Sequence, residues 1–172
     1  MGAAFARTVL CVTKPTVPLL NVGVEELKGS DAIKEADRML REVNIAMEYK
    51  GFTEGDGIGA GEVDVVVTDG FTGNIALKTA EGTANFITGE LRKAMTDSLI
   101  GKLSSLLNIS NLRKFKARLD PRLYNGAIFI GLDSPVIKSH GGTDYIGFSN
   151  SLSVCTKTVN NNLIEKITNN IK

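Results

Sequence analysis

The hydrophobic pattern of the chain centres on a valine-rich run. Residues 63–67 contain four valines without regular polar alternation, a pattern that predicts a strand buried on both faces of a sheet. The following turn carries Asp69, Gly70 and Gly73, and helical spacing begins near Asn74. We therefore predict a strand, a tight turn and a helix, with Asp69 at the carboxyl end of the strand.

Predicted strands and helices alternate along the rest of the chain, which is typical of an α/β fold. We expect a single domain over residues 1–172, and the glycines inside one predicted helix indicate close packing against another helix or subunit. In chain order, the pattern predicts a packed helical segment at 1–12, a strand at 17–22 that Pro18 weakens, a helix at 30–43, a strand at 44–52, a mobile loop at 53–62, a helix at 74–100 interrupted by Gly82 and Gly89, a hairpin at 127–138 and a closing helix at 145–171.

The composition narrows the classes of function. The 172 residues carry a net charge of +1, which fits one globular domain and argues against a nucleic-acid binder. No apolar run is long enough to cross a bilayer, and we expect no signal peptide. The single histidine disfavours a multi-histidine site, so we predict no metal. We expect Cys11 and Cys155 to be small buried residues.

Two polar loops are candidates for a binding site. Lys28 lies in a polar loop that follows the strand at 17–22, and Asp69 follows the strand at 63–67. Because ligands of parallel sheets bind outside the carboxyl ends of the strands, both loops are expected to face one crevice. The alternative for Lys28 is an ordinary solvated lysine.

The helix predicted after Asp69 adds potential backbone donors. Gly70 and Gly73 let the backbone approach a bound group closely. A helix that starts near Asn74 turns its unpaired N–H groups and the positive end of its dipole toward the turn, and such an end holds anions. The alternative is a plain turn in which Asp69 and Asn74 act as caps.

The only histidine lies in a second glycine-rich loop. His140 is followed by Gly141 and Gly142 and comes directly after the predicted hairpin. A lone histidine is usually structural or exposed, but this position at a strand end makes a role in binding equally plausible.

Residues 91–119 form a basic amphipathic stretch, broken near Gly101 and at 108–110. Such a stretch is typical of a helix that binds a membrane surface or a partner, and equally of a core-facing helix with a solvated basic side. The residues that we predict to contact a membrane are Leu99, Lys102, Leu103, Leu106, Leu107, Arg113 and Lys114.

Five segments, taken together and in order, resemble one known family. Residues 21–29 resemble the N-[IV]-G-x-E-E-x-K-G segment of the PlsX-type phosphate acyltransferases, and residues 64–74 resemble that family's DVVVxDGFxGN. The other matching positions are Leu77-Lys78, Glu81-Gly82, Leu119-Asp120-Pro121, Tyr124, Gly126-Ala127, Gly131-Leu132 and the VxKxHG-like segment 136–141.

The resemblance implies a fold and a reaction. The family has a three-layer α/β/α sandwich with a mostly parallel sheet, related to phosphotransacetylases and isocitrate-dehydrogenase-like folds, and this chain corresponds to its C-terminal half. The implied reaction converts acyl-[acyl carrier protein] and inorganic phosphate to acyl phosphate, the entry step to phosphatidic acid synthesis. The family further implies a homodimer in the bacterial cytoplasm that associates peripherally with the membrane. No cofactor is expected.

This reaction must hold an anion against a thioester carbonyl and stabilise the oxyanion that forms. We predict that Lys28 supplies positive charge, and that Asp69 orients Lys28 or accepts a proton from phosphate. The residues predicted to bind phosphate or substrate are Gly70, Gly73, Asn74 and His140.

Two other functions stay open at this stage. One is a related short-chain phosphate acetyl- or butyryltransferase. The other is a non-catalytic fragment that uses residues 91–119 to bind a membrane or a partner.

Overall fold

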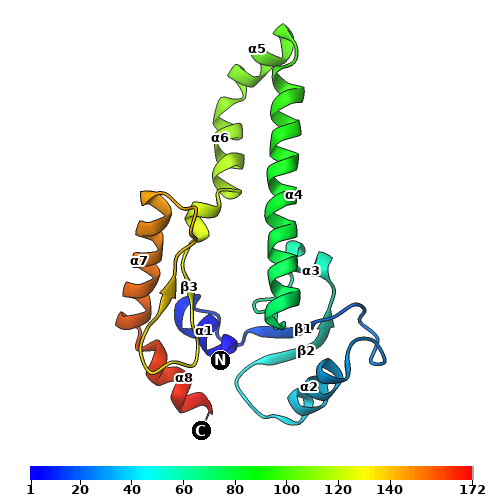
Figure 1. Ribbon diagram of the computed structural model, residues 1–172, viewed down its shortest axis with the longest axis vertical. Coiled ribbons are helices and arrows are strands. Elements are labelled where there is room, and N and C mark those ends of the chain that lie inside the picture. Colours follow the sequence, from blue (N-terminus) through cyan, green and yellow to red (C-terminus); the bar gives the residue numbers. More distant parts are fainter. Residues whose placement is uncertain (172) are drawn as a thin grey trace. The chain divides into compact units, whose positions relative to one another are not determined.

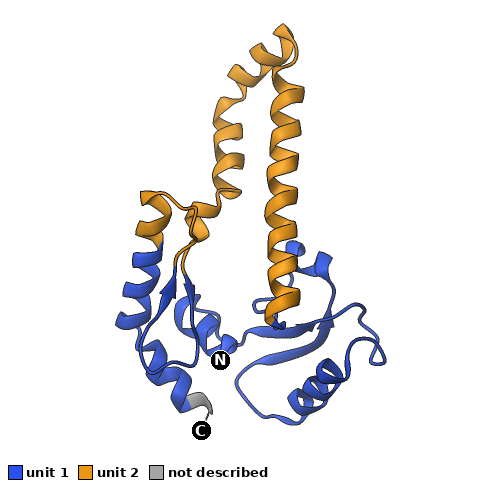
Figure 2. Cartoon of the chain, in the orientation of Figure 1, with its two compact units in different colours: residues 1–69, 127–138, 151–172 blue, residues 70–126, 139–150 orange. Residues whose placement is uncertain are grey.

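The computed structural model describes residues 1–171, which divide into two compact units (Figure 2). Unit 1 contains residues 1–69, 127–138 and the described part of 151–172, and unit 2 contains residues 70–126 and 139–150. The elements are α1 (Gly2–Val9), β1 (Thr16–Leu20), α2 (Asp31–Glu42), β2 (Glu48–Thr53), α3 (Gly55–Ala60), α4 (Gly70–Thr96), α5 (Leu99–Leu107), α6 (Ile109–Arg118), η1 (Pro121–Tyr124), β3 (Ala127–Ile128), β4 (Ile137–Lys138), α7 (Tyr145–Asn160) and α8 (Leu163–Ile171) (Figure 1).

Unit 1 contains a small parallel sheet, which confirms an α/β fold, and the antiparallel pair of β3 and β4. β1 and β2 pair in parallel, with Thr16 opposite Glu48. The run at 63–67 lies along the other side of β1 and joins it through a parallel bridge between Leu19 and Val67. β1 therefore lies between β2 and the run at 63–67.

Pro18 explains why the run at 63–67 forms a bridge instead of a full strand. The Val67 N–H donates to the Pro18 carbonyl at 3.0 Å, and the Leu20 N–H donates to the Val67 carbonyl at 2.8 Å. The bond before these two would run from the N–H of residue 18 to the Val65 carbonyl, and proline has no N–H to donate. The ladder therefore has a gap between the Val67 bond and the bond from the Val65 N–H to the Thr16 carbonyl at 3.1 Å. The prediction that this run is buried on both faces is wrong, because Val67 is 41% exposed.

The apolar core of unit 1 joins the two ends of the chain. Ala4 on α1 and Leu163 and Ile167 on α8 are buried together, and Phe5 and Ile128 pack against them. The expected packing of the N-terminal segment is confirmed. The predicted closing helix is two helices instead of one.

The structure also corrects the predicted loop at 53–62, the single closing helix and the burial of the two cysteines. The loop expected at 53–62 contains the short helix α3, which ends at Gly61 in the left-handed conformation. The closing helix breaks at Asn162, whose φ of 50° is incompatible with helix. Cys11 is exposed in the bend after α1 and Cys155 is half-buried, so the expectation of two buried cysteines is wrong.

In unit 2, α4 is continuous through both of its central glycines. A Cβ added at Gly82 or Gly89 would meet nothing within 4 Å, so the close packing expected there is not found within the described chain. α5 packs against α4 and is followed by α6. The amphipathic stretch thus breaks at 97–98 and at Asn108, not at Gly101.

Among residues 1–171, no helix is both long enough and apolar enough to cross a membrane.

Candidate functional site

In unit 1, a buried asparagine at the end of β1 shapes the loop that carries Lys28. The Asn21 Nδ2 donates to the Lys28 carbonyl at 3.1 Å, and its Oδ1 accepts from the Val22 N–H at 2.9 Å. Gly29 has a φ of +91°, and a Cβ at this position would collide with the Asn21 side chain. The loop is therefore fixed by its backbone and by Asn21.

Asn21 holds the backbone carbonyl of Lys28, and the Lys28 side chain remains exposed. Its ammonium forms no ion pair with any residue that the structure describes. Asp69 lies two residues beyond the Val67 bridge, so the loops of Lys28 and Asp69 leave the same edge of the parallel sheet. The two side chains form no ion pair with each other.

In unit 2, one amide side chain holds the loop of His140. The Asn125 Oδ1 accepts from the His140 N–H at 2.9 Å. Its Nδ2 donates to the Ser139 Oγ and to the Gly147 carbonyl, each at 2.9 Å. Asn125 thus ties the backbone before α7 to the segment after η1.

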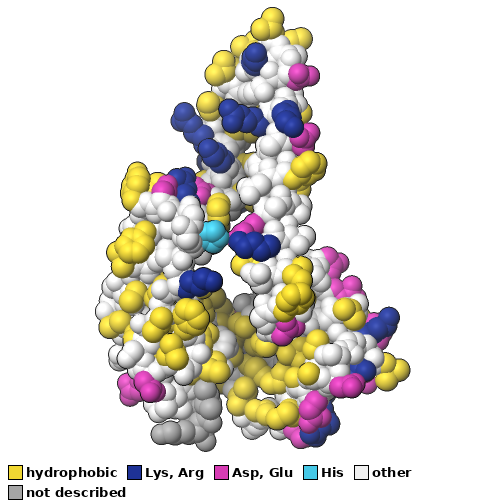
Figure 3. Space-filling model, viewed as in Figure 1, with side chains coloured by type: hydrophobic (Ala, Val, Ile, Leu, Met, Phe, Trp, Pro, Cys, Tyr) yellow, Lys and Arg dark blue, Asp and Glu magenta, His cyan; other side chains and the backbone are white. Residues whose placement is uncertain are grey.

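The ring of His140 lies against α4. The Gly142 N–H donates to His140 Nδ1 at 3.2 Å. The Lys78 Nζ lies 3.4 Å from His140 Nε2 and 2.6 Å from a Glu81 carboxylate oxygen. The hydrogen bond from Lys78 holds the pKa of Glu81 below its usual value. In Figure 3 the histidine, in cyan, lies beside a basic side chain.

Lys78 and Glu81 lie beside His140 and are candidate site residues that were not predicted from the sequence. The sequence holds a weak signal for them, because Asn74, Lys78 and Glu81 follow one another at helical spacing along one face of α4. The structure brings this face of α4 to His140.

The structure corrects the prediction that a helix starts near Asn74 with unpaired backbone N–H groups. α4 begins at Gly70 rather than near Asn74. The N–H groups of Gly73 and Asn74 are therefore engaged with carbonyls one turn earlier in the helix. Neither amide can donate to a ligand while α4 is intact.

An ion-pair network lies at the C-terminal end of the His140 loop. Arg122 binds Asp120 at 2.6 Å and Asp144 at 2.8 Å. Asp144 also accepts from the Ile146 and Gly147 N–H groups at the start of α7. The hydrogen bond from Arg122 lowers the pKa of Asp120 to about 2 and lowers that of Asp144 as well.

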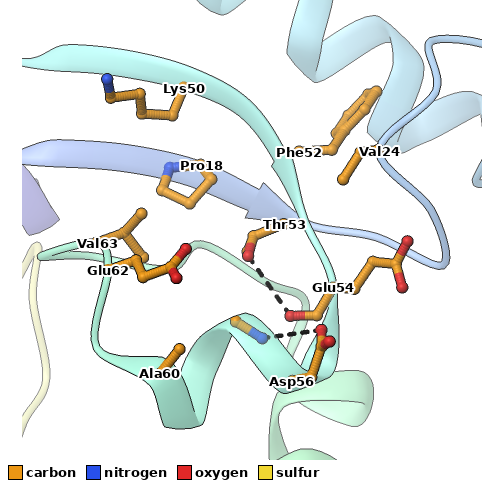
Figure 4. A pocket seen from close by; sticks show the side chains of 11 residues that line it. Pro18, Val24, Lys50, Phe52, Thr53, Glu54, Asp56, Ala60, Glu62 and Val63 are labelled. Carbon is orange, nitrogen blue, oxygen red and sulfur yellow. Dashed lines mark hydrogen bonds between the residues drawn. The ribbon is translucent and has the colours of Figure 1, made fainter.

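A cavity of about 650 Å³ lies in unit 1 at the end of β2 (Figure 4). Its polar lining is mostly acidic, and its lysine, Lys50, is already paired with Glu48 at 2.6 Å. A phosphate would be repelled there, so the cavity is not the anion site. None of the residues predicted from the sequence lines it. The acidic residues that line the cavity are Glu54, Asp56 and Glu62.

Within residues 1–171, no cluster of three His, Cys, Asp or Glu side chains is placed to hold a metal ion.

Comparisons with known proteins give a consistent result. A family model described as "Fatty acid synthesis protein" matches residues 1–166. The chain is 66% identical over 172 residues to a "Phosphate acyltransferase" of Pelagibacter ubique (strain HTCC1062), a match that covers 99% of the chain and 52% of that relative. It is 51% identical over 171 residues to a "Phosphate acyltransferase" of Rhodospirillum rubrum, covering 99% of the chain and 49% of the relative. The chain thus spans about half the length of these curated relatives.

Proposed function

The chain belongs to the family of fatty acid synthesis proteins, and from this membership we propose that it is the C-terminal part of a phosphate acyltransferase. The substrates are acyl-[acyl carrier protein] and inorganic phosphate, and the product is acyl phosphate for phosphatidic acid synthesis. The observation that carries this proposal is the 66% identity with the Pelagibacter ubique relative across nearly the whole chain. We further propose that an N-terminal half like that of the relatives completes a three-layer α/β/α sandwich with this chain.

The main requirement of this reaction is positive charge that holds the phosphate and stabilises the oxyanion. A phosphate oxygen bonds to the thioester carbonyl carbon, the C–S bond breaks, and the carrier leaves as a thiolate that then takes up a proton. A thiol with a pKa near 8.5 leaves readily, so strong acid catalysis is not needed. Holding the phosphate and stabilising the oxyanion are the larger tasks.

We assign these tasks to the polar loops. Lys28 supplies positive charge to phosphate or oxyanion, which its exposed and unpaired ammonium allows. Asp69 orients Lys28 when substrate is bound, or accepts a proton from monobasic phosphate. Gly70 lets the backbone approach the substrate, and His140 donates to the phosphate or to the acyl carbonyl.

The test is phosphate-dependent formation of acyl phosphate from a long-chain acyl carrier substrate. It should be run on this chain and on a length-restored chain, in which the N-terminal half of the Pelagibacter ubique relative precedes it. Activity in the length-restored chain with the long-chain substrate supports the proposal. Turnover of acetyl-CoA in preference to that substrate would make the enzyme a short-chain phosphate acyltransferase instead.

Lys28→Ala and Asp69→Asn in the length-restored chain test the assignment of roles. Each should lower turnover by about a hundredfold or more, the usual loss for one preorganised catalytic group. Lys34→Ala is the matched control, because Lys34 is a lysine on α2 already paired with Asp31. Turnover within about threefold of the parent would remove the substituted residue from the site.

We also propose that α5 and the start of α6 touch the cytoplasmic face of a bacterial membrane. Leu99 and Leu107 are 85% and 84% exposed, and Leu103 and Leu106 are exposed beside them. Lys102, Arg113 and Lys114 add the positive charge that anionic lipids attract. Figure 3 shows hydrophobic side chains gathered at this end of unit 2.

Binding to vesicles of anionic lipid tests this surface. Leu103→Glu should reduce co-sedimentation with the vesicles severalfold, because it puts a charge into the apolar face of α5. Ser104→Glu adds the same charge at the neighbouring exposed position and is the matched control. Equal losses in both variants would mean that net charge alone governs binding.

A second copy of the chain is the other partner that we propose, as a homodimer. The support is that α4 carries several exposed apolar side chains, among them Phe86 and Ile87.

A further inference from the structure

Both ring nitrogens of His140 face hydrogen-bond donors. The Gly142 N–H points at Nδ1 from 3.2 Å, and the Lys78 ammonium lies 3.4 Å from Nε2. A neutral imidazole carries one ring lone pair for hydrogen bonding, so it can accept from only one of these donors. The two donors therefore compete for the tautomer of His140.

The geometry favours the Gly142 amide. Its N–H is directed at Nδ1 by the backbone of a loop that Asn125 holds. The Lys78 ammonium is instead drawn to Glu81, at 2.6 Å on the same helix. With Nδ1 accepting, the ring hydrogen lies on Nε2.

In that tautomer, Nε2–H and the Lys78 ammonium are two donors that cannot bond to each other. They lie 3.4 Å apart, so an oxygen at about 2.8 Å from each nitrogen accepts from both. One donor is fixed on α4 and the other on the loop before α7, and both belong to unit 2.

We propose that Lys78 Nζ and His140 Nε2 form a two-donor site for one oxygen of inorganic phosphate, and that Glu81 is the positioning residue of Lys78. The identity of the anion rests on the proposed function, whereas the tautomer and the role of Glu81 do not. Without Glu81, the ammonium turns to Nε2, takes the lone pair and converts a donor into an acceptor. The site then loses one of its two donors.

NMR spectroscopy of the imidazole tests the tautomer directly. His140 is the only histidine of the 172 residues, so a long-range ¹H–¹⁵N spectrum of the chain reports one ring. We expect the Nε2–H tautomer in the parent chain, a shift toward Nδ1–H in Glu81→Gln, and retention of Nε2–H in Lys78→Met. A parent chain with Nδ1–H, or a Glu81→Gln spectrum equal to that of the parent, would overturn the proposal.

Titration with inorganic phosphate tests the site itself. Phosphate should move the Nε2 resonance in the parent chain, with affinity at least about tenfold weaker in Lys78→Met, because a charge-assisted hydrogen bond is lost. Lys93→Met is the matched control, since Lys93 forms the same 2.6 Å pair with Glu90 on α4. Equal affinities in the two variants would overturn the site.

The two proposals fail in different experiments. An inactive length-restored chain whose His140 ring still responds to phosphate refutes the acyltransferase and retains the two-donor site. An active length-restored chain whose ring shows no response refutes the two-donor site alone. Circular dichroism of Lys78→Met and Glu81→Gln verifies that each variant folds as the parent does.

Discussion

Gly29 decides whether the backbone under Lys28 can form. We predict that Gly29→Ala destabilises the chain more than Gly61→Ala, measured by urea unfolding. Both glycines have positive φ, +91° and +69°, so each alanine carries a strain of about 1–2 kcal/mol. Only the new Cβ at position 29 also collides with a side chain, that of Asn21, whereas position 61 has open space.

The difference in unfolding free energy between the two variants isolates the contribution of the Asn21 contact to the Lys28 loop. Gly29→Ala should also lower the activity of the length-restored chain, because the Asn21 bond to the Lys28 carbonyl is lost. Equal unfolding free energies for the two variants would show that the strain of positive φ is the whole effect.

The local sequence pattern identifies some of the candidate site residues and cannot identify others. Lys28 and Asp69 follow strand-like runs, so their position at one sheet edge was predictable from the sequence. Lys78 and Glu81 are separated by three positions on a helix, as are Glu90 and Lys93. Only a contact with His140, 62 positions away in the sequence, distinguishes the first pair.

At the scale of elements, type was more predictable than boundary. The helix predicted at 30–43 is present as α2, and the Ser30 side chain caps it by accepting a bond from the Ile33 N–H. The start of α4 was misplaced because Gly70 and Gly73 indicate a turn, yet both are helical. Glycine costs helix only about 1 kcal/mol relative to alanine, so it delays a helix only where nothing else favours one.

The Arg122 network joins η1 to the start of α7, and it should make unit 2 sensitive to acid. Folding lowers the pKa of Asp120 to about 2 and also lowers that of Asp144, against a usual value of about 3.9. Their contribution to stability is therefore complete above about pH 5 and is lost as pH falls through about 4 to about 2. Thermal unfolding should report a falling midpoint over this range.

Arg122→Met removes the largest cause of both lowered pKa values, the hydrogen bond from the Arg122 side chain. We expect a lower midpoint at pH 7 and a flatter dependence on acid in this variant. Asp133→Asn is the control, since Asp133 is exposed and makes no hydrogen bond or ion pair within the described chain. An acid transition of unchanged steepness in Arg122→Met would place its origin elsewhere.

At the scale of the whole molecule, the two units differ in what they bury. Leu163 is fully buried in unit 1, whereas α4, α5 and α6 have no buried residue in the described chain. The alternation of strands and helices predicted the α/β class, but not this asymmetry. Periodicity shows which face of a helix is apolar, but it does not show what covers that face. The chain also spans only about half the length of its relatives.

Hydrogen exchange should follow this asymmetry. A helix without buried contacts opens at low cost, so its amides exchange quickly. In dilute solution we expect the slowest exchange in β1 and α8 and fast exchange through α4, α5 and α6, measured by mass spectrometry. Protection of α4 equal to that of α8 in dilute chain would contradict the prediction.

The same measurement separates the partners of these helices. Protection that rises with protein concentration along α4 indicates a second copy of the chain, because only self-association depends on that concentration. Protection that appears in α5 only with anionic vesicles, and is absent in Leu103→Glu, indicates a lipid surface. If the length-restored chain protects all three helices by itself, the added N-terminal half is what covers them.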